Sequence, residues 1–155
     1  LRALNPDTAV EARPERLTAA NGRALAAAFD FVIDATDNFA SKFLIADCCH
    51  AAGTPCVHGG ILGFAGQAMT VLPGRTACYR CVFGSPPPEA PGEPRGPLGA
   101  VPGIIGAVQA AEAIKFLTGA GTLLAGRLLI VDALSMRMRT VAVRRSRECA
   151  LCSRL

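Results

Sequence analysis

The stretch FVIDATDNF, residues 31–39, points most directly to the fold of this chain. It starts with a short apolar run, residues 31–33, between two aspartates, which is typical of a buried strand in a parallel sheet. Asn38 is a good N-cap for a helix, and Gly53 followed by Pro55 would end that helix. A buried strand that leads at once into a helix is typical of an α/β protein.

The sequence on either side of this stretch continues the alternation of strands and helices. From residue 1 to residue 58 the predicted order is strand, helix, strand, helix, strand, which predicts βαβ crossovers and a parallel sheet with flanking helices. The expected elements are a strand at 8–12, a helix at 19–29, a strand at 31–33, a helix at 38–53, strands at 55–58 and 67–72, a helix at 103–118, and a C-terminal hairpin at 127–133 and 136–145.

The composition indicates one folded domain. Of the 155 residues, 51% are hydrophobic and 18% are charged. This is enough apolar surface for a single core and is unlike the composition of disordered chains. The sequence has no uninterrupted apolar run of membrane-spanning length and no signal peptide, so we expect no membrane partner and a cytoplasmic location. The chain begins at Leu1 and looks like part of something longer.

The net charge of +4 is mild, but the positive charge is concentrated near the C-terminus. A basic face there could meet phosphates or an acidic protein partner, and a solvated strand face is the favoured interpretation. Nucleic acid is not expected as a partner, because the sequence has one tyrosine and no tryptophan for base stacking. The clustered cations are Arg137, Arg139, Arg144, Arg145, Arg147 and Arg154.

Two C-x-x-C pairs, Cys78/Cys81 and Cys149/Cys152, predict a metal site. Each spacing lets two thiolates point at one metal ion, and two such turns complete the four-sulfur cage that zinc favours. Such a zinc ion would be structural, because four thiolates leave no open coordination position. The alternatives are a redox-active pair or disulfides in a secreted chain, and nothing in the sequence suggests secretion. The remaining cysteines are interpreted as buried thiols: Cys48, Cys49 and Cys56.

Polar side chains follow the predicted strand at 31–33: Asp34, Asp37 and Asn38. Ligands of open α/β sheets bind at this edge, where an aspartate can hold Mg²⁺ and a helix N-terminus favours phosphate. The alternative is an Asx turn with an N-cap, which any such junction needs. Both interpretations remain open from spacing alone.

Several familiar motifs are absent from the sequence. It contains neither G-x-G-x-x-G nor G-x-x-x-x-G-K-[ST], so the glycine loop that usually holds phosphates is not among these residues. The glycine-rich stretch at 59–66 lacks the required spacing and is interpreted as a tight turn. His50 and His58 stand apart from other candidate catalytic residues and are interpreted as packed or surface histidines.

Four motifs together resemble the ThiF/MoeB/HesA family. They are FVIDATDNF at 31–39, CYRC at 78–81, PGIIG at 102–106 leading into QAAEAIK at 109–115, and CALC at 149–152. The resemblance covers nearly the whole chain. Members of this family are E1-like enzymes that use ATP to adenylate the C-terminus of small ubiquitin-like sulfur-carrier proteins.

The resemblance implies a Rossmann-like parallel sheet, a homodimer, and attack of a Gly-Gly carboxylate on the α-phosphate of Mg·ATP. By the same resemblance, Asp37 matches the magnesium-linked acid and Asn38 its neighbour at the nucleotide, whereas Asp34 matches a position without a clear role. The structural zinc is expected on the four paired cysteines: Cys78, Cys81, Cys149 and Cys152.

The chain also departs from the family pattern. The family's glycine-rich loop, ribose-binding acid and basic phosphate ligands lie upstream of Leu1, so residues 1–155 are expected to be one E1-like domain that is inactive alone. The cysteine that relays sulfur in many relatives falls near Gly92, and residues 82–148 contain no cysteine, which favours an adenylation-only enzyme. The alternative function is a non-catalytic, zinc-stabilised remnant that binds a carrier or a dimer partner.

Overall fold

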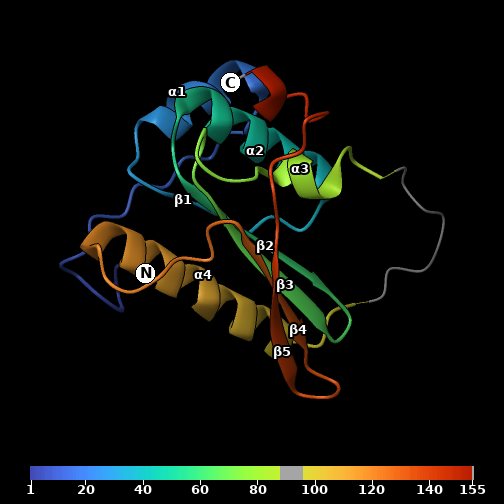
Figure 1. Ribbon diagram of the computed structural model, residues 1–155. Helices are drawn as coiled ribbons and strands as arrows, with labels where there is room; N and C mark the ends of the chain where they lie inside the picture. The colour runs from blue at the N-terminus through green and yellow to red at the C-terminus, as the bar shows by residue number, and fades with distance from the viewer. Residues whose placement is uncertain (88–95, 155) are drawn as a thin grey trace.

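The computed structural model describes residues 1–87 and 96–154 and consists of one five-stranded sheet with helices on both faces (Figure 1). Helices α1, α2 and α3 lie on one side of the sheet, and α4 crosses the other. The described elements are α1 (Ala19–Ala27), β1 (Val32–Asp34), α2 (Phe39–Ala52), β2 (Cys56–Leu62), β3 (Ala65–Val71), α3 (Tyr79–Phe83), α4 (Ala100–Thr118), β4 (Arg127–Asp132), β5 (Arg137–Ala142) and the 3₁₀ turn η1 (Cys152–Arg154).

The sheet is mixed rather than wholly parallel. Its strand order is β1-β2-β3-β4-β5, and only β1 and β2, which α2 connects, pair in parallel. The prediction of a parallel sheet therefore holds for this βαβ unit and is wrong for β3, which pairs antiparallel with both β2 and β4. The antiparallel pair of β4 and β5 is the predicted C-terminal hairpin. For β2 and β3 the reason is local, because Gly63 and Phe64 alone join these strands, and so short a connection can link only antiparallel neighbours.

Most predicted elements are present, with shifted ends. The α/β class, the flanking helices and the C-terminal hairpin are confirmed. The strand expected at 8–12 is wrong: these residues are mostly exposed and pair with no described strand, so alternation of small residues alone does not make a strand. In the glycine-rich stretch only Gly63, with φ of 57°, makes the turn, and its other glycines lie within β2 and β3.

The core lies on both faces of the sheet. Phe43, Ala46 and Cys49 of α2 pack with Met69 of β3 on one face, and the ring of Tyr79 from α3 joins them. On the other face, α4 packs through Val101, Ile105 and the partly buried Ile104, and Ile105 lies over β3. Gly66 of β3 allows this contact, because a Cβ atom there would lie 2.7 Å from Cγ1 of Ile105.

Helix α4 carries polar side chains that attach it to the sheet. Glu112 is 1% exposed, and its carboxylate accepts a hydrogen bond of 2.5 Å from Oγ1 of Thr70 and one of 2.6 Å from the backbone N–H of Leu124. By length and composition α4 could cross a membrane. Because two buried polar side chains, Gln109 and Glu112, bond to the sheet, α4 has the features of a core helix.

Candidate functional site

Asp37 and Asn38 lie at the carboxyl end of β1, where α2 begins. The side-chain oxygen of Asn38 accepts a hydrogen bond of 2.8 Å from the N–H of Ser41, which confirms the predicted N-cap. The amide nitrogen of Asn38 donates to Oδ1 of Asp37 over 3.2 Å. Both residues are exposed, so they are available to a ligand as well as to the helix end.

A cavity of about 430 Å³ opens beside this loop. Asp37, Asn38 and Lys42 line it from the α2 side, and Gly60 and Gln67 line it from the strands below. The cavity therefore brings a carboxylate and an ammonium group together next to a helix N-terminus. These are the groups that hold Mg²⁺ and anionic oxygens.

Asp34 lies behind the cavity and is completely buried. Its Oδ1 accepts hydrogen bonds from the N–H and the hydroxyl of Thr36, at 3.0 and 2.6 Å. Its Oδ2 lies 2.8 Å from Nδ1 of His58 and 3.4 Å from Nζ of Lys42. Burial raises the pKa of Asp34, but the hydrogen bond and charge of His58, with Thr36 and Lys42, bring this pKa below its usual value.

His58 does not stand apart, contrary to the sequence interpretation. It is a packed, buried histidine, as expected, but it contacts Asp34, and its Nε2 lies 3.4 Å from Sγ of Cys56. Residues 34 and 58 are register partners in the parallel pair of β1 and β2. The sequence contains both residues but not this register, which is why sequence reasoning missed the pair.

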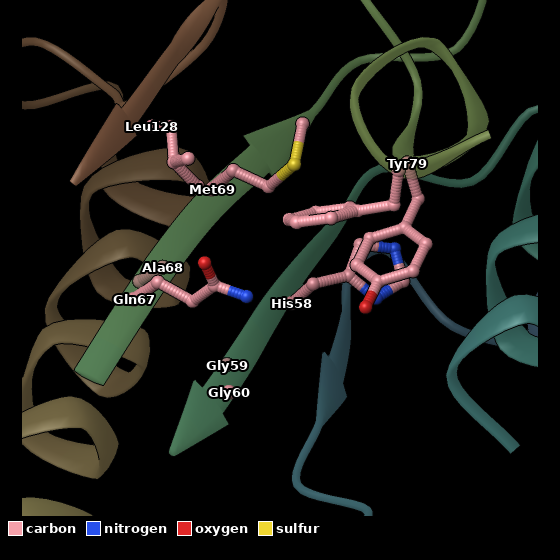
Figure 2. Close-up of a pocket in the computed structure, with 9 residues that line it drawn as sticks. His58, Gly59, Gly60, Gln67, Ala68, Met69, Tyr79 and Leu128 are labelled. Carbon is pink, nitrogen blue, oxygen red and sulfur yellow. The ribbon is translucent and has the colours of Figure 1, made fainter. Parts of the chain in front are cut away.

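The ring of His58 packs against that of Tyr79, with centroids 4.6 Å apart. Figure 2 shows these two side chains next to a small cavity, with Gln67 reaching toward them from β3. This cavity measures about 10 Å³, which is near the lower limit for one water molecule. Tyr79 and Gln67 also line the large cavity, so His58 is linked to the candidate site through them.

The four predicted ligand cysteines come together in the structure. Their Sγ atoms all lie within 4.8 Å of one another, and Cys78 is 3.7 Å from Cys81 and 3.4 Å from Cys149. A tetrahedral Zn–S₄ centre with bonds of about 2.3 Å needs sulfur atoms roughly 3.8 Å apart, so the donor set fits zinc. The N–H of Ser146 also points at Sγ of Cys81, over 3.4 Å, as outer-shell donors of metal sites do.

The two residues between the first pair of cysteines connect the metal site to α2. The guanidinium of Arg80 makes two hydrogen bonds to the carboxylate of Asp47, at 2.7 and 2.8 Å, and lies 4.9 Å from the ring centre of Phe43. The ring of Tyr79 meets Phe43 edge-on at 5.0 Å. The turn between the first two cysteines therefore contacts α2 directly, and the first turn of α2 lies at the candidate site.

The other predicted features have mixed outcomes. Cys48, Cys49 and Cys56 are buried and unpaired, as expected. All residues of β5 are exposed, which confirms a solvated strand for Arg137 and Arg139, whereas Arg145 bonds to the carbonyl oxygen of Cys152 over 2.8 Å. The position near Gly92, where the family resemblance leads one to expect a relay cysteine, lies outside the described residues.

Comparisons with known proteins identify similar sequences. Residues 1–152 match the ThiF family. The chain is 43% identical to the SAMP-activating enzyme E1 of Haloferax volcanii, over 98% of this chain and 57% of that protein. It is 42% identical to a sulfur carrier protein adenylyltransferase of Thermus thermophilus, over 98% of this chain and 59% of that protein. The chain therefore spans little more than half the length of these relatives.

A longer relative and a solved structure are also similar. The adenylyltransferase and sulfurtransferase MOCS3 of Arabidopsis thaliana is 41% identical over 97% of this chain and 33% of that protein. The crystal structure of E. coli MccB with ATP has a TM-score of 0.66 and 20% identity, and covers 80% of this chain and 40% of that chain. At this identity the structural match establishes a shared fold.

Proposed function

The chain belongs to the ThiF family, and from this premise we propose that it is part of an adenylyltransferase. The proposed reaction is ATP-dependent adenylation of the C-terminal Gly-Gly carboxylate of a small ubiquitin-like sulfur carrier, of the molybdopterin-synthase or thiamine type. The observation that carries the proposal is the cavity that Asp37 and Lys42 share at the start of α2.

The proposed nucleotide substrate is Mg·ATP. Asp37 would hold Mg²⁺ together with substrate phosphates, because this ion commonly takes one or two protein carboxylates and phosphate oxygens. Asn38 lies next to it and caps α2, whose N-terminus favours negative charge. The exposed position of Asp37 at the cavity supports this role.

The reaction needs little acid–base chemistry. A carboxylate oxygen of the carrier attacks the α-phosphorus, a new C–O–P link forms, and the bond to the β-phosphate oxygen breaks, which releases pyrophosphate. The nucleophile is already deprotonated at neutral pH, so no proton is transferred. The protein would mainly align the two substrates and offset negative charge near the phosphates. The ammonium group of Lys42, at the cavity, would supply positive charge for this purpose.

The carrier is proposed to lie over the sheet face that the cavity opens onto. Gly60, Gln67, Ile130 and Arg139 are successive cross-strand partners, so they lie on one face of the sheet. The first three line the cavity, and Arg139 extends the row to the exposed edge strand. Gly60 has no side chain, so it leaves room for a glycine tail in the cavity, and the arginine suits an acidic carrier surface.

Further parts of the proposal follow from the family and from the cysteines. The metal is proposed to be zinc with a structural role, bound by Cys78, Cys81, Cys149 and Cys152. The assembly is proposed to be a homodimer. A cytoplasmic location is proposed because seven unpaired thiols suit a reducing compartment.

The proposal is tested by ATP–pyrophosphate exchange with the complete protein and its carrier. We expect exchange that depends on Mg²⁺ and on the carrier, and that disappears when the Gly-Gly end of the carrier is removed. A protein that binds the carrier but forms no adenylate and supports no exchange would instead be a non-catalytic E1-like remnant. Measuring carrier binding alongside exchange separates these two functions.

A further inference from the structure

Asp34 does not line the large cavity, yet its carboxylate contacts two groups that determine the shape and charge of that cavity. It is fully buried at the end of β1, and its backbone oxygen accepts a hydrogen bond of 2.7 Å from Nε2 of Gln109. The hydrogen bond from α4 fixes the backbone of Asp34. With its backbone held in this way and its side chain buried, Asp34 can hold the loop that follows it in one position.

The first of these groups is the backbone that carries Asp37. Both bonds from Thr36, the N–H at 3.0 Å and the hydroxyl at 2.6 Å, end on Oδ1 of Asp34. Thr36 directly precedes Asp37 in the chain, so these bonds restrict the direction in which Asp37 leaves the loop. Hydrogen bonds to a buried carboxylate are about twice as strong as neutral ones, which makes this restriction effective.

The second group is the ammonium of Lys42. Its Nζ lies 3.4 Å from Oδ2 of Asp34 and also donates to the carbonyl oxygen of Gly59. The side chain is only 8% exposed, and Lys42 lines the cavity. An ammonium group has three N–H donors. Two of them bond to described residues, and the third remains for an oxygen in the cavity.

We propose that Asp34 is a positioning residue for the adenylation site: it orients Asp37 through Thr36, and it holds Lys42 so that its third N–H donates to an anionic substrate oxygen. This assignment rests on the proposed function. The anionic oxygen is either a nucleotide phosphate or the carboxylate of the carrier, since both offer the same acceptor to an ammonium group.

The burial of this charge supports a positioning role. A buried ion pair seldom adds net stability, because removing both charges from water costs about as much as their attraction returns. A purely structural contact between β1, β2 and α2 could be made by apolar side chains. The arrangement of Asp34, Lys42 and His58 instead keeps a cation at the wall of the cavity.

The orientation of Asp37 through Thr36 is tested with Thr36→Val in the complete protein. Loss of the hydroxyl is expected to raise the Mg²⁺ concentration for half-maximal exchange and the KM for ATP by about tenfold, with little change in the KM for the carrier. Thr36→Ser restores the hydroxyl and should restore these values. Thr140→Val, the same change at an exposed position of β5, should leave exchange and Mg²⁺ dependence unaltered.

The proposed role of Lys42 as a donor to a substrate oxygen is tested with Lys42→Met, which keeps approximately the length of the side chain and removes its charge. A rise of about tenfold in the KM for ATP alone would identify a phosphate as the acceptor, and a rise in the KM for the carrier alone would identify the carboxylate. Asp34→Asn should reproduce the Lys42→Met defect, because an amide can still accept a hydrogen bond from Thr36 but no longer pairs with the ammonium. Melting temperatures verify that each variant is folded.

The two possible failures are distinguishable. If the wild-type protein exchanges pyrophosphate while Thr36→Val and Lys42→Met keep all three constants within twofold, the positioning role is wrong and the proposed function stands. If the wild-type protein binds a Gly-Gly carrier and shows no exchange, the proposed function fails, and the assignment of Asp34 fails with it.

Discussion

At the scale of single residues, the buried carboxylate of Asp34 connects the parts of the βαβ unit. Asp34 receives hydrogen bonds on both oxygens, from Thr36 on one side and from His58 and Lys42 on the other. Each partner comes from a different part of the βαβ unit: the loop after β1, strand β2 and helix α2. Loss of the charge on Asp34 therefore weakens the pairs with His58 and Lys42, whereas an amide oxygen at this position can still accept the hydrogen bonds from Thr36.

The contribution of the ionised Asp34 carboxylate should appear in the pH dependence of the free energy of unfolding. Because the pKa of Asp34 is lowered in the folded protein from its ordinary value of 3.8, its ionised form adds stability above that value and loses it as the pH falls through the folded pKa. We expect Asp34→Asn to lower the free energy of unfolding at pH 7 by roughly 3–5 kcal/mol, as expected when one partner of a buried ion pair is removed.

The measurement is urea unfolding of wild type and Asp34→Asn between pH 7 and pH 3. The difference between the two should begin to shrink as the pH falls below about 4, where the carboxylate of the unfolded chain becomes protonated, and should shrink further as the pH approaches the lowered pKa of the folded protein. Asp30→Asn, at the exposed start of the same strand region, is the matched control. A constant difference at every pH would mean that the charge of Asp34 does not contribute.

At the scale of elements, the metal site joins segments that are far apart in the sequence. Cys78 and Cys81 lie at the start of α3, and Cys149 and Cys152 lie near the C-terminus, beyond the hairpin of β4 and β5. Because α3 also contacts α2 through Arg80 and Tyr79, a metal ion bound by these cysteines would help to hold the helix that begins at the candidate site. Metal binding should therefore be coupled to folding.

Removal of the metal should destabilise the protein. We expect a chelator, or the variant Cys149→Ala, to lower the melting temperature by roughly 10 °C or more, since folding and metal binding are coupled. Cys48→Ala, a similarly buried thiol outside the metal site, should lower it much less. The measurement is thermal unfolding with parallel determination of bound metal. Equal melting temperatures for the two variants would contradict the role of the cluster.

At the scale of the whole molecule, the sequence predicted the parts that depend on local pattern. The N-cap at Asn38, the end of α2 at Gly53 and the convergence of two C-x-x-C pairs follow from residue type and spacing, and the structure confirms them. The antiparallel pairing of β2 and β3 could also have been predicted from the sequence, because only residues 59–66 separate the expected strands, which is too few for the crossover that parallel neighbours need.

The features that the sequence did not predict depend on strand register and on contacts between distant elements. The pair of Asp34 and His58 forms because β1 and β2 place these residues opposite each other. The contact of Gln109 with the backbone of Asp34 requires α4 to cross the sheet at that point. In both contacts the two residues belong to different elements, so no regular spacing in the sequence indicates that they meet.

The central claim for the whole molecule is that Asp37 takes part in adenylation. The most direct test is ATP–pyrophosphate exchange by the complete protein, compared among wild type, Asp37→Ala and the exposed control Asp30→Ala. We predict that Asp37→Ala lowers exchange by roughly a hundredfold or more while bound metal and melting temperature stay unchanged, and that Asp30→Ala matches wild type. Exchange at the wild-type rate in Asp37→Ala would contradict the assignment of the site.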